Sequence, residues 1–286
     1  MNSINMDSIF IPAQKPPHSC QDYCIVGETK DFKYAILCDG CSSSKDTDIG
    51  ARLLAHACKQ VLNIYSSCDI RGFLHVAKFE IIEKSYDISK SLNLNETCLD
   101  ATIIISIFKD DKIYYIMFGD GNIIASNKEN KVKLFQSISF DQNAPAYLSY
   151  FINSERHQVY NSNIKFRKIK SYIDNNGIPI INEREDPIRF PRLLSFVEVD
   201  STKCFFISSD GIESFYNIKT GEKIPSIDIV KELINIKSKH GEFLKRRVRR
   251  MMEDLAKKDI YNSDDVSVCG FIIEEKINGD GIQESI

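Results

Sequence analysis

Short runs rich in β-branched and aromatic residues recur along the chain and predict β-strands. Polar pairs such as Lys30-Asp31 and Asp110-Asp111 separate neighbouring runs and are typical of hairpin turns. None of the runs approaches the ~20 apolar residues that a membrane-spanning helix needs, so no membrane segment is expected. The predicted strands cover residues 22–28, 34–39, 101–108, 112–118, 122–126, 131–135, 203–208 and 266–273.

Four longer segments have the spacing of amphipathic helices. They cover residues 49–65, 70–92, 226–236 and 242–258. In the first, which Thr47 or Asp48 can cap, the positions expected to be buried recur every four residues, at Ile49, Leu53, Ala57 and Val61. In the last, Leu244, Val248, Met251 and Leu255 form an apolar stripe. The basic run 245–250 is therefore expected to be a solvated helix face rather than a surface for nucleic acid.

The segment 136–200 has no clear hydrophobic period. It contains Asn175-Asn176-Gly177 and prolines at 179, 187 and 191, and is expected to be an irregular insertion. Strands and helices are otherwise grouped rather than alternating, which favours an α+β fold of antiparallel sheets covered by helices. We expect one domain over residues 1–273, followed by a polar tail at 274–286 that is disordered.

Composition narrows the possibilities further. The 286 residues are 43% hydrophobic and 27% charged, and the net charge of −3 gives no general attraction to nucleic acid or anionic membrane. The nine cysteines are odd in number and lack paired C-x-x-C spacings, so we expect reduced thiols and no zinc ribbon. The amino terminus has no basic region followed by an apolar one, so no secretory signal is expected. Together these features predict a cytoplasmic protein.

One pattern carries chemistry: an apolar strand that runs into aspartate followed by glycine. It occurs at Asp39-Gly40, Asp120-Gly121 and Asp210-Gly211, and the pair Asp264-Asp265 precedes the last predicted strand. A single Asp-Gly is common in turns. Several carboxylates at the ends of buried strands would repel one another, and a divalent cation that takes oxygen ligands removes that repulsion. The recurrence therefore predicts a metal site.

These residues resemble the motifs of PP2C-type protein phosphatases, most closely the bacterial branch. The resemblance runs over 19–273, with the motifs in the family's order. They are Gln21-Asp22, Asp39-Gly40, Gly50-Ala51, Asp100-Ala101-Thr102, Gly119-Asp120, Ser209-Asp210-Gly211 and Asp264-Asp265-Val266-Ser267. It implies a four-layer α-β-β-α sandwich of two antiparallel sheets flanked by helices. The resemblance also implies a metal-dependent phosphatase acting on phosphoserine and phosphothreonine. In such enzymes the position of the insertion 136–200 often carries a flap near the site, which implies that this segment sets specificity.

The resemblance implies a role for each matched position. Asp39 would bridge two Mn²⁺ or Mg²⁺ ions and the carbonyl of Gly40 would bind one of them, while Asp210 and Asp264 would hold the first ion. Asp22 would serve the second ion, and Asp120 with Asp210 a weaker third. Asp39, Asp210 and Asp264 are thereby the expected catalytic residues, and a water shared by the two ions would attack phosphorus. The implied partners of this monomer are a phosphorylated protein and a cognate serine/threonine kinase.

The sequence also departs from the family. Cys41 follows Asp39-Gly40 where eukaryotic members have histidine, and Gln21 replaces a glutamate. The phosphate-gripping arginine found upstream in many members is absent, and of the cations there, Lys15 and His18, we assign that role to Lys15. These departures keep open a second hypothesis, a catalytically inactive binding or regulatory protein on the same fold.

Two other enzyme classes are disfavoured. Ser42-Ser43-Ser44-Lys45 fits S-x-x-K and Lys219-Thr220-Gly221 fits K-T-G, the signatures of penicillin-recognising serine acylases. The first lies in a predicted loop rather than at the start of a buried helix, and no Ser-Asp-Asn lies between the two. The five histidines have no spacing typical of zinc ligands.

Overall fold

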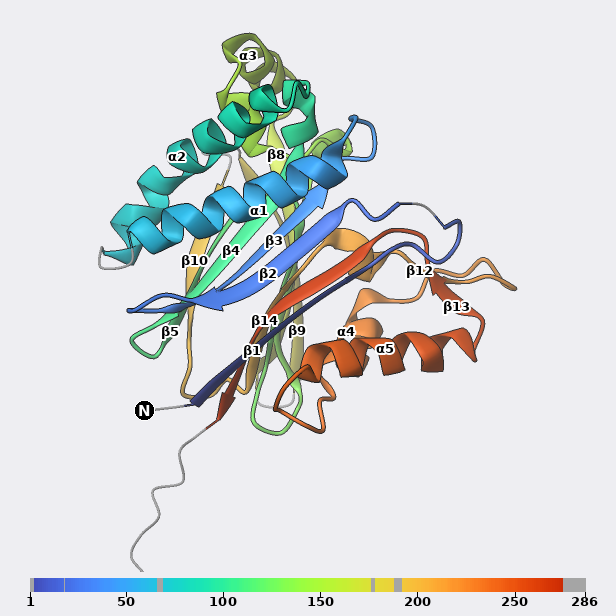
Figure 1. Ribbon diagram of the computed structural model, residues 1–286. Helices are drawn as coiled ribbons and strands as arrows, with labels where there is room; N and C mark the ends of the chain where they lie inside the picture. The colour runs from blue at the N-terminus through green and yellow to red at the C-terminus, as the bar shows by residue number, and fades with distance from the viewer. Residues whose placement is uncertain (1–2, 18, 66–68, 176–177, 188–191, 275–286) are drawn as a thin grey trace, which may run out of the picture.

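The computed structural model describes residues 3–17, 19–65, 69–175, 178–187 and 192–274 (Figure 1). Within them, every strand pair is antiparallel. The seven-stranded sheet has the order β1 (Ser3–Ile11), β14 (Val266–Glu274), β11 (Cys204–Ser208), β6 (Gly121–Ser126), β7 (Val132–Phe140), β8 (Phe166–Asn175) and β9 (Ile178–Pro187). The five-stranded sheet has the order β10 (Arg192–Glu198), β5 (Lys112–Phe118), β4 (Ala101–Lys109), β3 (Lys33–Gly40) and β2 (Asp22–Glu28).

Helices cover the outer face of each sheet. Helices α1 (Thr47–Ile64) and α2 (Ile70–Ser91) lie over the five-stranded sheet, and α4 (Ser226–Ile234) and α5 (Phe243–Ala256) lie against the seven-stranded one (Figure 1). A short helix, α3 (Ser154–Asn163), lies near one end of α2, and β12 (Phe215–Asn217) pairs with β13 (Ile260–Asn262). The predicted four-layer sandwich of antiparallel sheets and helices is confirmed.

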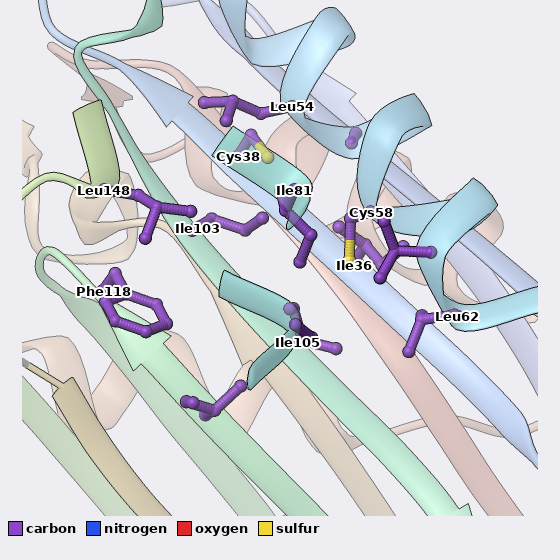
Figure 2. Packing of buried hydrophobic residues seen from close by; sticks show 14 of the residues in the cluster. Ile36, Cys38, Leu54, Cys58, Leu62, Ile81, Ile103, Ile105, Phe118 and Leu148 are labelled. Atoms are coloured by element: carbon purple, nitrogen blue, oxygen red, sulfur yellow. The ribbon is translucent and has the colours of Figure 1, made fainter. Parts of the chain in front are cut away.

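The layers explain why most of the central strands are continuously apolar. Along β3, Tyr34, Ile36 and Cys38 pack under α1 and α2, as Figure 2 shows for the last two. Ala35 and Leu37 point the other way, into the space between the sheets. Because successive side chains of a strand point to opposite faces, a strand buried on both faces needs apolar residues at every position. The absence of hydrophobic alternation in these runs therefore reflects a sheet covered on both sides.

The buried stripe of α1 differs from the predicted one. Ala57 and Val61 are buried as expected, but Ile49 is 37% exposed and Leu53 is only partly buried. The helix instead packs through Ala51, Leu54, Ala55, Cys58 and Leu62 (Figure 2). A strict four-residue spacing turns about 40° further around an α-helix at each step, so a face must mix three- and four-residue spacings.

The segment 136–200 is not irregular, contrary to the prediction. Strand β7 continues to Phe140, β8 and β9 form a long hairpin, and β10 joins the edge of the five-stranded sheet. Most of β9 is exposed to solvent, so its sequence carries no hydrophobic period to reveal it. The amino-terminal strand β1, which was not predicted, is likewise an edge strand, paired with β14.

The structure also tests the expectations for α5, for the cysteines and for membrane-spanning helices. The apolar stripe of α5 is buried, and Arg246, Arg249 and Arg250 are exposed as expected. Arg247 differs, because its side chain is only 13% exposed and pairs with Glu232 of α4. The eight described cysteines are free thiols, whereas Cys68 and most of the polar tail, from 275 onward, lie outside the described residues. Among the described helices, none has the length and apolar character needed to span a membrane.

Candidate active site

Four aspartates from four separate segments line one cavity of about 500 Å³. Asp39 ends β3, Asp120 joins β5 to β6, Asp210 follows β11, and Asp264 precedes β14. In an antiparallel sheet the end of one strand lies beside the starts of its neighbours. Ser208 of β11 pairs with both Val268 of β14 and Asn122 of β6. The last three of these aspartates therefore lie together where these inner strands of the seven-stranded sheet end or begin.

Two glycines permit this convergence. Gly121 follows Asp120 with φ of 122°, a conformation that L side chains rarely adopt, so the chain can turn from one sheet into the other. Gly211 follows Asp210 so closely against β14 that a Cβ atom there would lie 1.7 Å from the carbonyl oxygen of Asp265. This approach keeps the end of β11 beside the segment that carries Asp264.

The cavity concentrates negative charge. Burial raises the pKa of Asp39 well above its ordinary value, and Asp22, Asp210, Asp120 and Asp264 raise it further. Burial also raises the pKa of Asp210, with Asp120 and Asp264 adding to the effect. The pKa of Asp120 is raised by burial although Thr102 Oγ1 donates a 2.8 Å hydrogen bond to its carboxylate. Each carboxylate makes ionisation of the others costly, which is the condition that a bound cation relieves.

Asp22 lies behind the cavity rather than in its wall. It is paired in register with Asp39, is only 2% exposed, and its Oδ2 atom has no hydrogen-bond partner. Burial raises its pKa to about 7, and the charge of Asp265 adds to this rise, whereas the nearby hydroxyl of Ser267 opposes it. A buried carboxylate oxygen without a partner is costly and calls for a positive group or an ordered water.

The second member of the Asp264-Asp265 pair has a structural role. The carboxylate of Asp265 accepts hydrogen bonds from the backbone N–H of Ala13 (2.9 Å) and of Gln21 (2.6 Å). It thereby fixes the segment that leads into Asp22. Gln21, which replaces a glutamate of the family, donates from its side-chain amide to Thr47 Oγ1 at 2.7 Å. Its side chain thus ties β2 to the start of α1.

The donor set fits a hard divalent cation. Asp39, Asp120, Asp210 and Asp264 offer carboxylate oxygens, and Gly40 adds a backbone carbonyl in the same wall. Across the described ranges, however, no three His, Cys, Asp or Glu side chains already converge closely enough to hold an ion. The partnerless Oδ2 of Asp22 is a further oxygen available to a cation.

The cavity also contains residues that the sequence did not single out. Glu213 lies one turn beyond Asp210 and accepts a 2.5 Å hydrogen bond from Ser137, and the phenol of Tyr147 lies in the wall. Burial raises the pKa of Tyr147, so this phenol keeps its proton at neutral pH. The spacing of Glu213 from Asp210 was a usable signal, whereas nothing local marks Lys223, which joins the wall through its bridge to Tyr216.

The cation chosen from the sequence lies elsewhere. Lys15 is exposed, with its ammonium 5.5 Å from the ring of Tyr261, and does not belong to the cavity wall. His18 lies outside the described residues. The S-x-x-K match at Ser42–Lys45 precedes α1 and is not part of a buried helix. Of its residues, Ser42 and Ser43 line the cavity beside Cys41.

Comparisons with known proteins agree with this architecture. The staphylococcal serine/threonine phosphatase Stp1 (Staphylococcus aureus) superposes with a TM-score of 0.58 at 10% identity, covering 96% of both chains. A serine/threonine phosphatase of S. agalactiae gives 0.57 at 13% identity, covering 95% of this chain and all of that one. PstP/Ppp of Mycobacterium tuberculosis gives 0.54 at 12% identity, with 96% and 100% covered. At these identities the likeness shows a shared fold.

Membership in the family rests on the sequence profile. No curated protein matches this sequence. The family described as Protein phosphatase 2C does match, over residues 15–258, which is most of the chain and spans three of the four aspartates in the cavity. The fold and the acidic cavity agree with that match. The chain therefore belongs to the protein phosphatase 2C family of serine/threonine phosphatases.

Proposed function

We propose that this protein hydrolyses phosphoserine and phosphothreonine monoesters in phosphoproteins and that it requires Mn²⁺ or Mg²⁺. The observation that carries the proposal is the meeting of Asp39, Asp120, Asp210 and Asp264 in one cavity. Asp39, Asp120 and Asp210 are half-buried and Asp264 is exposed at the rim. Bringing four carboxylates this close, three of them partly removed from water, costs stability without a compensating cation. A cluster kept at that cost is typical of a functional site.

Each residue has a distinct proposed task. Asp39, the carbonyl of Gly40, Asp210 and Asp264 would hold two ions, Asp22 would serve the second, and Asp120 with Asp210 would hold a weaker third. Divalent cations, when bound, supply charge neutralisation and a Lewis acid that activates water. Thr102 fixes the carboxylate of Asp120 through its hydroxyl. Asp265 fixes the segment before Asp22 through two backbone N–H groups.

Phosphate binding is assigned to Lys223 in place of Lys15. Lys223 is exposed and lines the same cavity as the four aspartates, so it is the lysine available there to a phosphoryl oxygen. An ammonium placed there offsets the negative charge of an incoming phosphate, which the carboxylates would otherwise repel. We further propose that the protein is a cytoplasmic monomer. Its substrates would be phosphorylated by a cognate kinase.

The test is hydrolysis of p-nitrophenyl phosphate and of a phosphothreonine peptide, with Mn²⁺ or with EDTA. We expect turnover with Mn²⁺, none with EDTA, and a loss of at least about 10³-fold in Asp39→Asn, because that substitution removes a shared ligand of both ions. Asp254→Asn, at an exposed carboxylate of α5, is the matched control and should keep full activity. Folded wild-type protein that binds Mn²⁺ but hydrolyses neither substrate would support the alternative, a binding protein on the phosphatase fold.

A further inference from the structure

A second cavity of about 520 Å³ lies beside the acidic one. Its wall is mainly apolar and comes from α3 and the segment before it. The apolar contributors are Ala144, Tyr150, Val159, Tyr160 and Ile164. Val159 is 60% exposed although it is apolar, so this surface is open to solvent in the isolated chain.

The two cavities share one wall. Gln142 and Ala144 line the second cavity, whereas Asn143 and Pro145 line the acidic one. Alternate residues of a single stretch of chain therefore face opposite sides. Gln142 and Asn143 both have positive φ, at 56° and 51°, which marks a tight local turn. A single segment of backbone, residues 142–145, therefore separates the acidic cavity from the apolar one.

This wall is held by several contacts. The phenol of Tyr160 donates a 3.0 Å hydrogen bond to the carbonyl of Ala144, which joins α3 to the wall. One turn earlier on the same face of α3, Arg156 Nη2 lies 2.8 Å from both carboxylate oxygens of Asp100. Because Arg156 is paired in this way, and Glu155 is the other charged residue lining the cavity, no uncompensated cation there favours an anionic ligand.

We infer that the second cavity receives an apolar side chain of the phosphoprotein substrate, near the phosphorylated residue in its sequence. The inference rests on the proposed phosphatase function. An extended peptide advances about 3.3 Å per residue, so a chain whose phosphoresidue enters the acidic cavity crosses the shared wall within a few residues. Burying an aliphatic or aromatic side chain against Ala144, Val159 and Ile164 removes apolar surface from water on both partners. Preference for such substrates is the consequence.

The test uses a set of phosphothreonine peptides in which each position near the phosphothreonine is, in turn, leucine. Each peptide is compared with a matched peptide that has serine at the same position. Wild type should prefer leucine at one or two positions by about 10-fold or more in kcat/KM, the usual effect of an apolar pocket. Val159→Asp should remove that preference and leave turnover of the serine peptides and of p-nitrophenyl phosphate unchanged. Ile64→Asp, at a 64% exposed apolar residue of α1, is the matched control and should keep the preference.

Three results separate the possibilities. No preference for leucine in the wild type, or equal loss with both peptide sets in Val159→Asp, overturns the inference while the phosphatase function stands. Val159→Phe fills the cavity without adding charge and should shift the preference toward smaller apolar residues. Wild-type protein that hydrolyses none of the peptides and no p-nitrophenyl phosphate overturns the proposed function itself, and the inference with it.

Discussion

At the scale of single residues, Asp100 connects the segment around α3 to the loop 41–44. Its buried carboxylate accepts hydrogen bonds from Ser44 (3.0 Å), Ser149 (2.6 Å) and Arg156 (2.8 Å), and its backbone carbonyl accepts one from the N–H of Cys41. Asp100 therefore holds both ends of the loop 41–44, which follows Asp39-Gly40. The carboxylate needs its cationic partner because it is buried.

Removing that partner should destabilise the fold. Arg156→Ala leaves the Asp100 charge uncompensated, and we expect a loss of about 2–3 kcal/mol in the free energy of unfolding, below the value for a fully buried pair since the guanidinium is 25% exposed. Arg156→Lys keeps the charge and should lose less. Urea denaturation measures both. Arg249→Ala, at an exposed residue of α5, is the control, and an equal loss there would contradict the assignment.

The acidic residues should weaken the protein when no metal is bound. In EDTA at neutral pH, Asp39→Asn should raise the melting temperature by a few degrees, because it removes one of several mutually repelling charges. The sign follows from the raised pKa of Asp39: its ionised form is less favourable in the folded than in the unfolded protein. Calorimetry with EDTA measures the shift, and a lower melting temperature for the variant would refute the account.

At the scale of elements, α5 is capped by a residue from another part of the chain. The carboxylate of Asp7, on β1, accepts hydrogen bonds from the backbone N–H groups of Leu244 (2.8 Å) and Lys245 (3.0 Å). The residue at the helix's own cap position, Glu242, makes no such bond with its side chain. The edge strand and the outer helix are thus joined through two of the four N–H groups that every helix start leaves unpaired.

Removing the Asp7 cap of α5 should lower stability and leave catalytic activity unchanged. Asp7→Ala should lower the free energy of unfolding by about 1–2 kcal/mol, the range for a cap that also meets the helix dipole. Phosphatase activity below the unfolding transition should be unchanged. Asp254→Ala, near the other end of α5, is the control and should change stability by less than about 0.5 kcal/mol.

The contact of η4 (Asp210–Glu213) with β14 depends on a missing side chain. Gly211→Ala would place a Cβ atom 1.7 Å from the Asp265 carbonyl oxygen, so the backbone must move and Asp210 with it. We expect a loss of more than about 2 kcal/mol in stability and a strong loss of Mn²⁺-dependent turnover. Gly221→Ala meets no atom within 4 Å, although its φ is 72°, and should cost only about 1 kcal/mol and no activity.

At the scale of the whole molecule, two sheets contribute to one acidic site. A divalent cation bound there would couple the strand ends of both sheets, because it would bind the folded arrangement and not the unfolded chain. Mn²⁺ at 100 times its dissociation constant should raise the free energy of unfolding by about 2.7 kcal/mol. Thermal unfolding at increasing Mn²⁺ measures this, and the same shift in Asp39→Asn would exclude the acidic cavity as the site.

The sequence by itself determined much of the fold, because a buried segment can be recognised from its own run of apolar residues. Strands covered on both faces, such as β3 and β4, are continuously apolar, and their ends agree with prediction to within a residue or two. The aspartates at strand ends predicted the acidic site because glycine and charge interrupt these runs abruptly. Edge elements left no such record, so β1 and the hairpin of β8 and β9 were missed.

Only the tertiary structure decided which distant residues meet. Strand order places Asp264 beside Asp210, and the crossover from β5 to β6 carries Asp120 to the same cavity. The tertiary structure also shows that Lys223, and not Lys15, lines the acidic cavity, and that the apolar cavity shares a wall with the acidic one. The physical reason is that periodicity reports whether a residue is buried, whereas the neighbour it meets depends on pairing between strands far apart in the chain.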